Sequence, residues 1–453
     1  MGFGISDWRL ARAVSKLGQL GVVSGTALDV VIARKLQEGD PGGHVRRALE
    51  HFPFQPVARR IIDTYYVPGG LPEEAPFKQI PMHTLECRRH QQELCIAGNF
   101  VEVFLAREGH TNPVGINYLE KIQIPHLPSI YGAMLAGVAA VIMGAGIPLS
   151  IPGTLNALTR HQAVEYPVNV TGPDGGNEIF NLQFDPSRFI ADAHVPPELV
   201  RPDFLPIVSS AGLASILQRK ASGSIEGFIV EGNVAGGHNA PPRGRMRLDP
   251  GNEPVYGPRD VVNLAAFREC GLPFWLAGMY GSSEGLQRAR DEGAAGVQVG
   301  TAFALCKESG LLPGVRRELI REAVAGKARI FTDTRASPTG FPFKVADLAG
   351  SLSEEAVYRQ RRRICDIGFL RQPYRKPDGT IGYRCAAEPV AAYVAKGGKE
   401  EDTIGRKCLC NALAANIGMP QRLPDGTYEK PLVTMGDDLV DIGRFCAPGQ
   451  LDY

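Results

Sequence analysis

One histidine follows two glycines shortly after an apolar run, in a setting that suits proton transfer. Residues 227–231 read Gly-Phe-Ile-Val-Glu, a short buried β-type run, and His238 comes after Ala235-Gly236-Gly237. An imidazole takes or gives a proton near neutral pH, and a flat ring can pack against glycines that carry no side chain. A loop histidine with only a local hydrogen bond fits the same pattern. The glycine pair and the position after a strand favour a catalytic role for His238.

Two later apolar runs end in glycine turns that suit a phosphate group. The first ends in Ala277-Gly278-Met-Tyr-Gly281 and the second in Val299-Gly300-Thr301. Glycine lets backbone N–H groups approach phosphate oxygens, and the start of the following helix adds the positive end of a dipole. Either turn alone fits a plain strand-to-helix connection equally well. Because the two turns follow the last two predicted strands, Gly278, Gly281, Gly300 and Thr301 predict a site for a phosphorylated cofactor.

The elements that must position these residues alternate between strand and helix. Strands are predicted near residues 20, 115, 141, 206, 229, 276 and 298, and helices over 7–18, 27–37, 211–221 and 283–292. This alternation is typical of a parallel α/β fold. It predicts a (β/α)8 TIM barrel, with ligands at the C-terminal ends of the strands. Seven strands are counted, so the first strand is either truncated or supplied differently. An open doubly wound sheet gives the same alternation and is the alternative.

Segments that break the alternation divide the rest of the chain. A long insertion after the second strand covers about residues 40–112, with helical stretches near 45–50 and 57–65. Residues 163–200 form a second insertion that begins with a β-hairpin, because two alternating runs flank a glycine-rich turn. We therefore predict a cofactor-binding barrel over residues 1–345 and a cysteine-containing C-terminal extension over residues 346–453.

The C-terminal extension holds five of the nine cysteines. Cys408 and Cys410 stand two residues apart, and with Cys365 and Cys385 they could bind zinc or an iron–sulfur cluster. Their spacing matches no standard ligand pattern, and packed thiols are the alternative. Residues 373–383 are predicted to form a turn between two short extended segments.

Charge and hydropathy exclude several classes of function. The chain has 49 basic and 48 acidic residues, a net charge of +1 and no long run of one sign, so a nucleic-acid or membrane footprint is not expected. No run of eighteen apolar residues predicts a transmembrane helix, and the first residues do not resemble a signal peptide. We expect a cytoplasmic protein with reduced thiols that acts on a small molecule, and a homo-oligomer is left open.

Several of these motifs together carry a family resemblance. They are Met1-Gly2 before a helix and Leu20-Gly-Val-Val, Gly115-Ile-Asn117, Ala235-Gly-Gly-His238, Ala277-Gly278, the run from Gly293 to Phe303, and Thr332-Asp-Thr-Arg335. With these motifs, residues 1–345 resemble the nitronate monooxygenase family, formerly called 2-nitropropane dioxygenases. The resemblance extends to enoyl-acyl-carrier-protein reductase II, which shares the Gly-Gly-His loop.

The resemblance implies an FMN-dependent barrel that oxidises alkyl nitronates with dioxygen. The FMN phosphate would lie on the turns at Gly278, Gly281, Gly300 and Thr301, and the other expected cofactor contacts are Gly2, Asn117, Gly144, Gly236 and Gly237. His238 would stand beside the substrate as acid and base. The alternatives are an NAD(P)H-dependent enoyl or quinone reductase on the same barrel, with NAD(P)H as electron donor, or a flavin-binding subunit without catalysis.

The chain departs from the family pattern after His238, where it continues Asn-Ala-Pro-Pro-Arg-Gly. Arg243 or Arg245 in this continuation could bind an anionic substrate, although surface arginines are commoner. Lys121 and His126 follow the strand that ends at Asn117, and we expect both to be solvated. The substrate is therefore less well defined by the sequence than the cofactor.

Overall fold

A seven-stranded parallel sheet forms the centre of the computed structural model, which describes residues 2–190, 195 and 197–453. Met1 of the Met1-Gly2 motif and residues 191–194 and 196 of the predicted second insertion lie outside the described residues. The strands are β1 (Gly21–Ser24), β2 (Val114–Leu119), β3 (Ala140–Gly144), β6 (Asp203–Val208), β7 (Phe228–Glu231), β9 (Phe274–Ala277) and β10 (Gly296–Gln298). All seven predicted strands are confirmed.

The strand order is that of a barrel. Each strand pairs in parallel with the strand before and after it in the sheet, in the order β1-β2-β3-β6-β7-β9-β10. A doubly wound sheet reverses direction at a switch point, and this order has none. The α/β class and the barrel-type order are therefore confirmed, with β1 and β10 as the two edges of the described sheet.

Side chains inside the sheet show that it curls. Val22 of β1 packs in the same small apolar cluster as Ile142 of β3, Leu205 of β6, Ile229 of β7 and Trp275 of β9. Strands so far apart in a flat sheet could not share one cluster. The interior of the curled sheet is therefore filled with side chains, and a ligand must bind at its rim.

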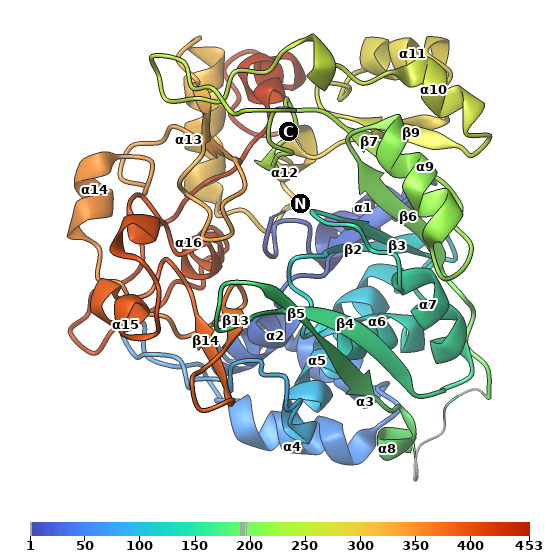
Figure 1. Cartoon of the computed structure of the whole chain (residues 1–453), viewed down its shortest axis with the longest axis vertical. Coiled ribbons are helices and arrows are strands. Elements are labelled where there is room, and N and C mark those ends of the chain that lie inside the picture. Colours follow the sequence, from blue (N-terminus) through green and yellow to red (C-terminus); the bar gives the residue numbers. More distant parts are fainter. Residues whose placement is uncertain (1, 191–194, 196) are drawn as a thin grey trace.

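Some of the helices pack against the strands of the central sheet, whereas others lie away from it (Figure 1). The helices before β6 are α1 (Trp8–Lys16), α2 (Leu28–Gln37), α3 (His44–Glu50), α4 (Gln55–Tyr65), α5 (Arg89–Arg107), α6 (His126–Leu135), α7 (Ile151–Thr159) and α8 (Ser187–Ile190). Those after β6 are α9 (Ala211–Lys220), α10 (Leu264–Glu269), α11 (Ser283–Asp291), α12 (Thr301–Ala304), α13 (Pro313–Val324), α14 (Glu355–Gln360), α15 (Val390–Ala395) and α16 (Leu409–Ala415). Helices α1 and α5 pack against β1 and β2, α9 against β6 and α11 against β10, whereas α14 and α15 lie away from the sheet (Figure 1). Within the described residues, no helix has the length and apolar character of a membrane span.

Helix α5 was not predicted from the sequence, although it is central to the helix layer. It packs against α1, α2 and α6, and fifteen of its nineteen residues are buried. Because nearly every side of α5 faces protein, its sequence lacks the one-sided apolar period that marks a surface helix. Buried polar residues such as Asn99 and Glu102 further mask the pattern.

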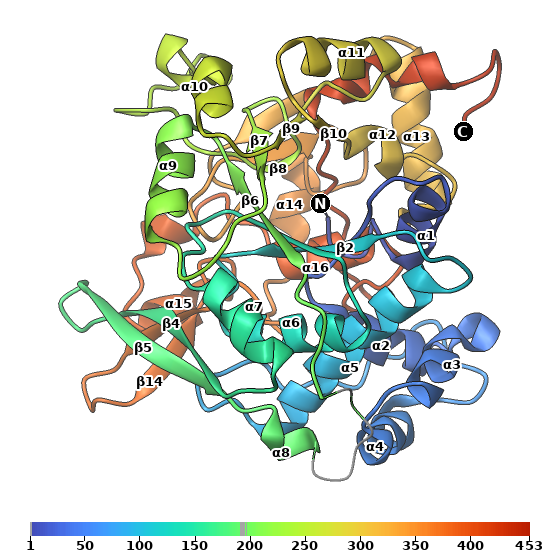
Figure 2. The same ribbon diagram turned by 90° about the vertical axis from the view of Figure 1, so that its right-hand side faces the viewer.

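The C-terminal residues join the predicted hairpin in a second sheet. Strands β4 (Val164–Thr171) and β5 (Asn177–Phe184) form that hairpin, and β13 (Gln372–Arg375) and β14 (Ile381–Arg384) form another. Both hairpins are confirmed. Tyr374 of β13 pairs in parallel with Thr171 of β4, so the sheet order is β14-β13-β4-β5. Figure 2 shows this sheet apart from the central one.

We expect Gly132→Ala to destabilise the fold, because a Cβ at Gly132 of α6 would lie 2.1 Å from the backbone oxygen of Ile96 in α5. Separating two close-packed helices should lower the free energy of unfolding by about 1–3 kcal/mol in urea titrations. The matched control is Gly212→Ala in α9, where nothing lies within 4 Å of the added methyl group. That change should raise the free energy by about 0.5–1 kcal/mol. Equal effects at both positions would contradict the packing argument.

Candidate active site

Two adjoining cavities open at the C-terminal ends of the barrel strands. Their empty volumes are about 1130 Å³ and about 910 Å³, with the solvent at their mouths included. We call them the turn cavity and the histidine cavity. The residues that line both are Gly2, Phe3, Glu231, Gly236, Gly237, Leu413 and Thr434. The Gly236–Gly237 loop therefore lies where the two cavities meet.

The structure brings the sequence-predicted site residues to these two cavities. The turn cavity is lined by the four residues of the predicted phosphate turns, Gly278, Gly281, Gly300 and Thr301. The histidine cavity is lined by Asn117, Gly144 and His238. The residues predicted beside the flavin, Gly2, Gly236 and Gly237, line both. The structure thus brings the predicted site residues together at two adjoining cavities, and their roles in catalysis and cofactor binding stay predictions.

His238 is held by residues that the sequence did not single out. Gly237 and His238 form the short strand β8, and His238 pairs antiparallel with Phe343 of β12 (Phe343–Ala346). The Nε2 atom of His238 lies 2.7 Å from the Ser337 hydroxyl, which lies 2.8 Å from the Thr339 hydroxyl. The Phe343 ring packs edge-on against the imidazole, with centroids 4.8 Å apart. One ring nitrogen is thus fixed, and the ring has a defined orientation.

Burial keeps His238 neutral. Loss of solvent lowers its pKa well below the usual value, and the nearby positive charge of Lys121 lowers it further. A neutral imidazole at neutral pH is ready to accept a proton.

Glu231 is a titratable residue of the site that sequence reasoning missed. It is the last residue of β7, and it lines both cavities. Burial raises its pKa to about 7, against the opposing charge of Lys121. The signal that could have found it is its position at a strand end, beside Ala277 at the rim of the barrel.

The structure contradicts the expectation that Lys121 and His126 are solvated. The Lys121 ammonium lies 4.0 Å from the centroid of the Phe341 ring and has no hydrogen-bond partner among the described residues. Burial lowers its pKa to about 7. His126 is 2% exposed, and its Nε2 lies 3.0 Å from the Leu119 carbonyl oxygen. Side chains from distant parts of the chain cover this loop after β2: the Phe341 ring lies against Lys121, and Tyr166 of β4 packs edge-on against His126. The local sequence does not reveal these contacts.

The C-terminal segment 433–438 crosses the mouth of the barrel. The backbone N–H of Gly237 donates to the Thr434 hydroxyl at 2.8 Å, and that of Gly436 donates to the Thr301 hydroxyl at 2.9 Å. A Cβ on Gly236 would lie 2.9 Å from the backbone nitrogen of Gly436, so only glycine permits this crossing. The Thr301 side chain, predicted to bind the cofactor, thus also anchors the C-terminal segment.

The glycine turns leave backbone donors free at the turn cavity. Gly278 adopts a positive φ of 91°, which a side chain would strain. In the described part of the chain, no acceptor pairs with the backbone N–H groups of Gly281 and Gly300. Gly281 also precedes α11, whose N-cap is Ser282. Free N–H groups at a helix start suit an anion.

The acidic side chain of Asp438 lies beside these free N–H groups. A Cβ on Gly281 would lie 2.9 Å from the Asp438 carboxylate, which lines the turn cavity. Arg444 forms an ion pair with Asp438 at 2.8 Å. This pairing offsets the negative charge of Asp438 beside the free N–H groups.

Two other groups were singled out in the sequence: Arg243 and Arg245 lie outside the cavity walls, whereas Cys410 lines the histidine cavity. Arg243 is exposed and donates to the Ser209 carbonyl oxygen at 3.1 Å, and neither it nor Arg245 lines either cavity. All nine cysteines are free thiols. Among the described residues, the one group of three potential metal ligands within 4.8 Å contains none of the C-terminal cysteines Cys365, Cys385, Cys408 and Cys410. Cys408 is buried, and Cys365, Cys385 and Cys410 are partly buried.

Comparison with known proteins bears on the segment that carries the Gly-Gly-His loop and both glycine turns. Residues 199–334 match the family model described as nitronate monooxygenase. The resemblance to the nitronate monooxygenase family is confirmed.

Curated relatives match parts of the chain. A nitronate monooxygenase from Paraburkholderia phytofirmans is 32% identical over 134 residues, which are 30% of this chain and 35% of the relative. An octahydroindene-carboxyl-CoA dehydrogenase from Mycobacterium tuberculosis is 26% identical over 210 residues, or 44% of this chain and 56% of the relative. The chain therefore spans from about a third to just over half of these relatives.

Solved structures give weaker similarity. Nitroalkane oxidase from Streptomyces ansochromogenes is 15% identical with a TM-score of 0.42, and the match covers 92% of this chain and 94% of that one. The enoyl reductase domain of MlnA from Bacillus amyloliquefaciens is 11% identical with a TM-score of 0.43, and the match covers 100% and 88%.

The free energy of unfolding should depend on pH because the Glu231 carboxyl is buried in this candidate site. Because the pKa of Glu231 is raised from 4.5 to about 7 in the fold, its stabilising contribution is complete below about pH 4.5 and is lost as pH rises through 7. Between pH 5 and pH 8 this one group should lower the free energy of unfolding by up to roughly 3 kcal/mol. Urea titrations of Glu231→Gln should lack that decrease, whereas Glu86→Gln, at an exposed position, should keep it. An unchanged pH dependence in Glu231→Gln would rule out the buried carboxyl as its source.

Proposed function

We propose that the chain is an FMN-dependent oxidoreductase that oxidises an alkyl nitronate or a related small carbon acid with dioxygen. The observation that carries the proposal is the joining of the two cavities at Gly236–Gly237, with free backbone donors in one and a neutral His238 in the other. A cofactor phosphate and a reacting carbon would then lie on opposite sides of one glycine loop. The match of residues 199–334 to the nitronate monooxygenase family model supports the same activity.

The turn cavity fits the FMN phosphate. The free N–H groups of Gly281 and Gly300 would donate to phosphate oxygens, and the start of α11 would add the positive end of its dipole. Gly2, Asn117, Gly144, Gly236, Gly237, Gly278 and Thr301 would complete the FMN contacts. When bound, FMN supplies a ring that takes up electrons from the substrate and passes them to dioxygen.

In this proposal His238 moves the proton. With Nε2–H donating to the Ser337 hydroxyl, Nδ1 keeps its lone pair and can accept a proton from the substrate carbon or from a protonated nitronate. The Phe343 ring and the Ser337–Thr339 pair hold the imidazole in place, so little reorganisation is needed.

The C-terminal residues shape the substrate side. The apolar side chains that this part of the chain contributes to the histidine cavity are Ile367, Phe369, Leu370, Leu409 and Leu413. They suit a compact alkyl group and exclude water from the reacting atoms. On this proposal residues 1–345 form the FMN barrel and residues 346–453 supply the substrate wall. The nine free thiols fit a reducing, cytoplasmic location.

A second candidate is an NAD(P)H-dependent enoyl or quinone reductase. The observation that favours it is the charge of the histidine cavity, whose lining, within the part of the chain that the structure describes, includes Glu231 but no lysine or arginine. Such a wall suits a neutral enoyl compound or quinone better than a preformed anion.

Anaerobic flavin reduction distinguishes these candidates. We expect an alkyl nitronate to bleach the flavin of the purified holoprotein. The parent nitroalkane must first lose its carbon proton, so His238→Asn should slow bleaching by the nitroalkane by roughly a hundredfold or more through loss of the proton acceptor. The control His90→Asn changes an exposed histidine of α5 and should keep the wild-type rate. Bleaching by NADH or NADPH alone would favour the reductase, and no bleaching by any donor would favour a non-catalytic flavin-binding subunit. A colourless protein that cannot be reconstituted with FMN would refute the flavin proposal itself.

The ion pair at the turn cavity should control FMN affinity. Arg444→Ala would leave the Asp438 carboxylate unpaired beside the phosphate site. We expect FMN to bind roughly tenfold more weakly, a loss of about 1.4 kcal/mol, measured by fluorescence quenching as apoprotein is added. The matched control is Arg444→Ala combined with Asp438→Asn, which should restore affinity to within a few-fold of the wild type. Equal affinity in all three proteins would place the phosphate elsewhere.

A further inference from the structure

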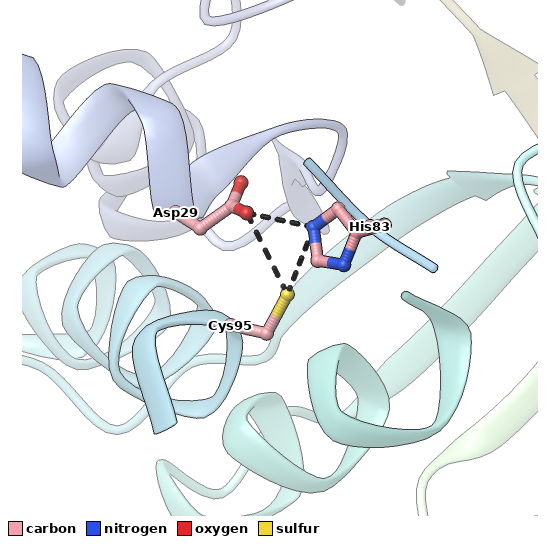
Figure 3. Close-up of side chains that lie close together, drawn as sticks. All are labelled: Asp29, His83 and Cys95. Carbon is pink, nitrogen blue, oxygen red and sulfur yellow. Dashed lines mark hydrogen bonds and ion pairs between the residues drawn. The ribbon is translucent and has the colours of Figure 1, made fainter. Parts of the chain in front are cut away.

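Three side chains from distant parts of the chain meet in the helix layer, outside the proposed flavin site. Asp29 lies in the first turn of α2, His83 in the segment between α4 and α5, and Cys95 on α5 (Figure 3). Their exposed fractions are 3%, 9% and 2%. Neither the predicted cofactor contacts nor the proposed proton transfer uses any of them.

The three ligand-type atoms converge on one point. The Nε2 atom of His83 lies 2.8 Å from Oδ2 of Asp29 and 3.7 Å from Sγ of Cys95, and Sγ lies 3.8 Å from the same Oδ2. A single nitrogen of His83 therefore faces both the carboxylate and the thiol (Figure 3). In a nucleophile relay, the acid and the nucleophile bind opposite nitrogens of the imidazole. The arrangement is thus unsuited to activating Cys95 as a nucleophile.

The same triangle matches three corners of a metal site. With bond lengths of about 2.3 Å to sulfur and about 2.0–2.2 Å to nitrogen and oxygen, a tetrahedral zinc ion sets its sulfur–nitrogen and sulfur–oxygen edges at roughly 3.6 Å. The observed edges of 3.7 and 3.8 Å are close to this. The nitrogen–oxygen edge would open from 2.8 Å to roughly 3.4 Å as the hydrogen bond is replaced by two bonds to the ion.

Charge also favours a cation here. The Asp29 carboxylate accepts from the backbone N–H of Val30 at 2.8 Å and has His83 as its ion-pair partner among the described residues. A divalent cation would bind the thiolate form of Cys95. One carboxylate, one thiolate and a neutral imidazole would then balance two positive charges.

We propose that Asp29, His83 and Cys95 form a binding site for a divalent transition-metal ion of the zinc class. The mixture of thiolate, imidazole and carboxylate selects zinc-like ions over magnesium or calcium, which prefer oxygen ligands. Asp29 and Cys95 also line a small cavity, together with Tyr118 and Ser129. This site does not depend on the proposed FMN chemistry.

The metal would fasten an irregular segment to the helix layer beside the substrate wall. Residues 66–88 connect α4 to α5 and contain His83. The Phe369 ring packs edge-on against the His83 ring at 5.1 Å, and Phe369 also lines the histidine cavity. A metal bond to His83 would therefore stabilise one side of that cavity.

Cobalt binding to the full-length protein tests the site. Purified protein, stripped of metal under reducing conditions, is titrated with Co²⁺ and then with Zn²⁺. We expect about one equivalent of Co²⁺ to bind per chain. The spectrum should show a thiolate-to-cobalt charge-transfer band with the intensity of a single thiolate ligand, and visible bands typical of tetrahedral Co²⁺. All of these bands should disappear when Zn²⁺ is added. Absence of the charge-transfer band in the folded wild-type protein would overturn the proposal.

Variants assign the ligands. Cys95→Ser should abolish the charge-transfer band, and His83→Gln should weaken Co²⁺ binding by more than the roughly 10–100-fold that loss of an outer partner costs. The controls Cys306→Ser and His51→Asn lie outside the cluster and should keep wild-type spectra. Unchanged spectra in both cluster variants would overturn the assignment. If either variant fails to fold, the wild type still decides, because added Zn²⁺ should raise its melting temperature and a chelator should reverse the rise.

Discussion

The close crossing of two backbones at the barrel mouth sets the geometry of everything around it. Segment 433–438 lies against the Gly236–Gly237 loop at a distance that no side chain at Gly236 would allow. Hydrogen bonds from Gly237 to Thr434 and from Gly436 to Thr301 fix the crossing on both sides. Segment 433–438 lines the turn cavity, and its Thr434 also lines the histidine cavity. This C-terminal segment is therefore an integral wall of the site.

Burial determines the chemistry that this geometry can support. Glu231, Lys121 and His238 lie near one another, and desolvation is the largest cause of each pKa shift. In each case burial favours the neutral form, so the site can hold acids and bases near neutral pH with little net charge. Such an environment strengthens any interaction with charge that develops during a reaction. The same desolvation reduces stability at some pH values, which is a common feature of functional sites.

Local sequence signals predicted the barrel and much of the candidate site. The strands are short apolar runs bounded by glycine or polar residues, and the site residues stand where those runs end, so chain order alone placed His238 and Gly300 at one rim. Features that depend on distant contacts were missed. Helix α5 lost its one-sided pattern because it is buried on nearly every side. Ser337, which orients His238, comes from a segment about a hundred residues later. Lys121 was expected to be solvated because nothing near it in the sequence indicates the Phe341 ring that lies against its ammonium.

The second sheet has a consequence for how the chain reaches its native state. Tyr374 pairs with Thr171 across about two hundred residues, and the walls of the proposed site include residues close to the C-terminus. Contacts between residues so far apart in the sequence form late in folding, because the chain between them must first be synthesised and ordered. During synthesis the barrel strands leave the ribosome well before residues 433–438, so the mouth stays open until that segment has also been made. The ligand pocket then matures after the barrel, and a product truncated before residue 433 would keep the barrel strands without a closed place to bind.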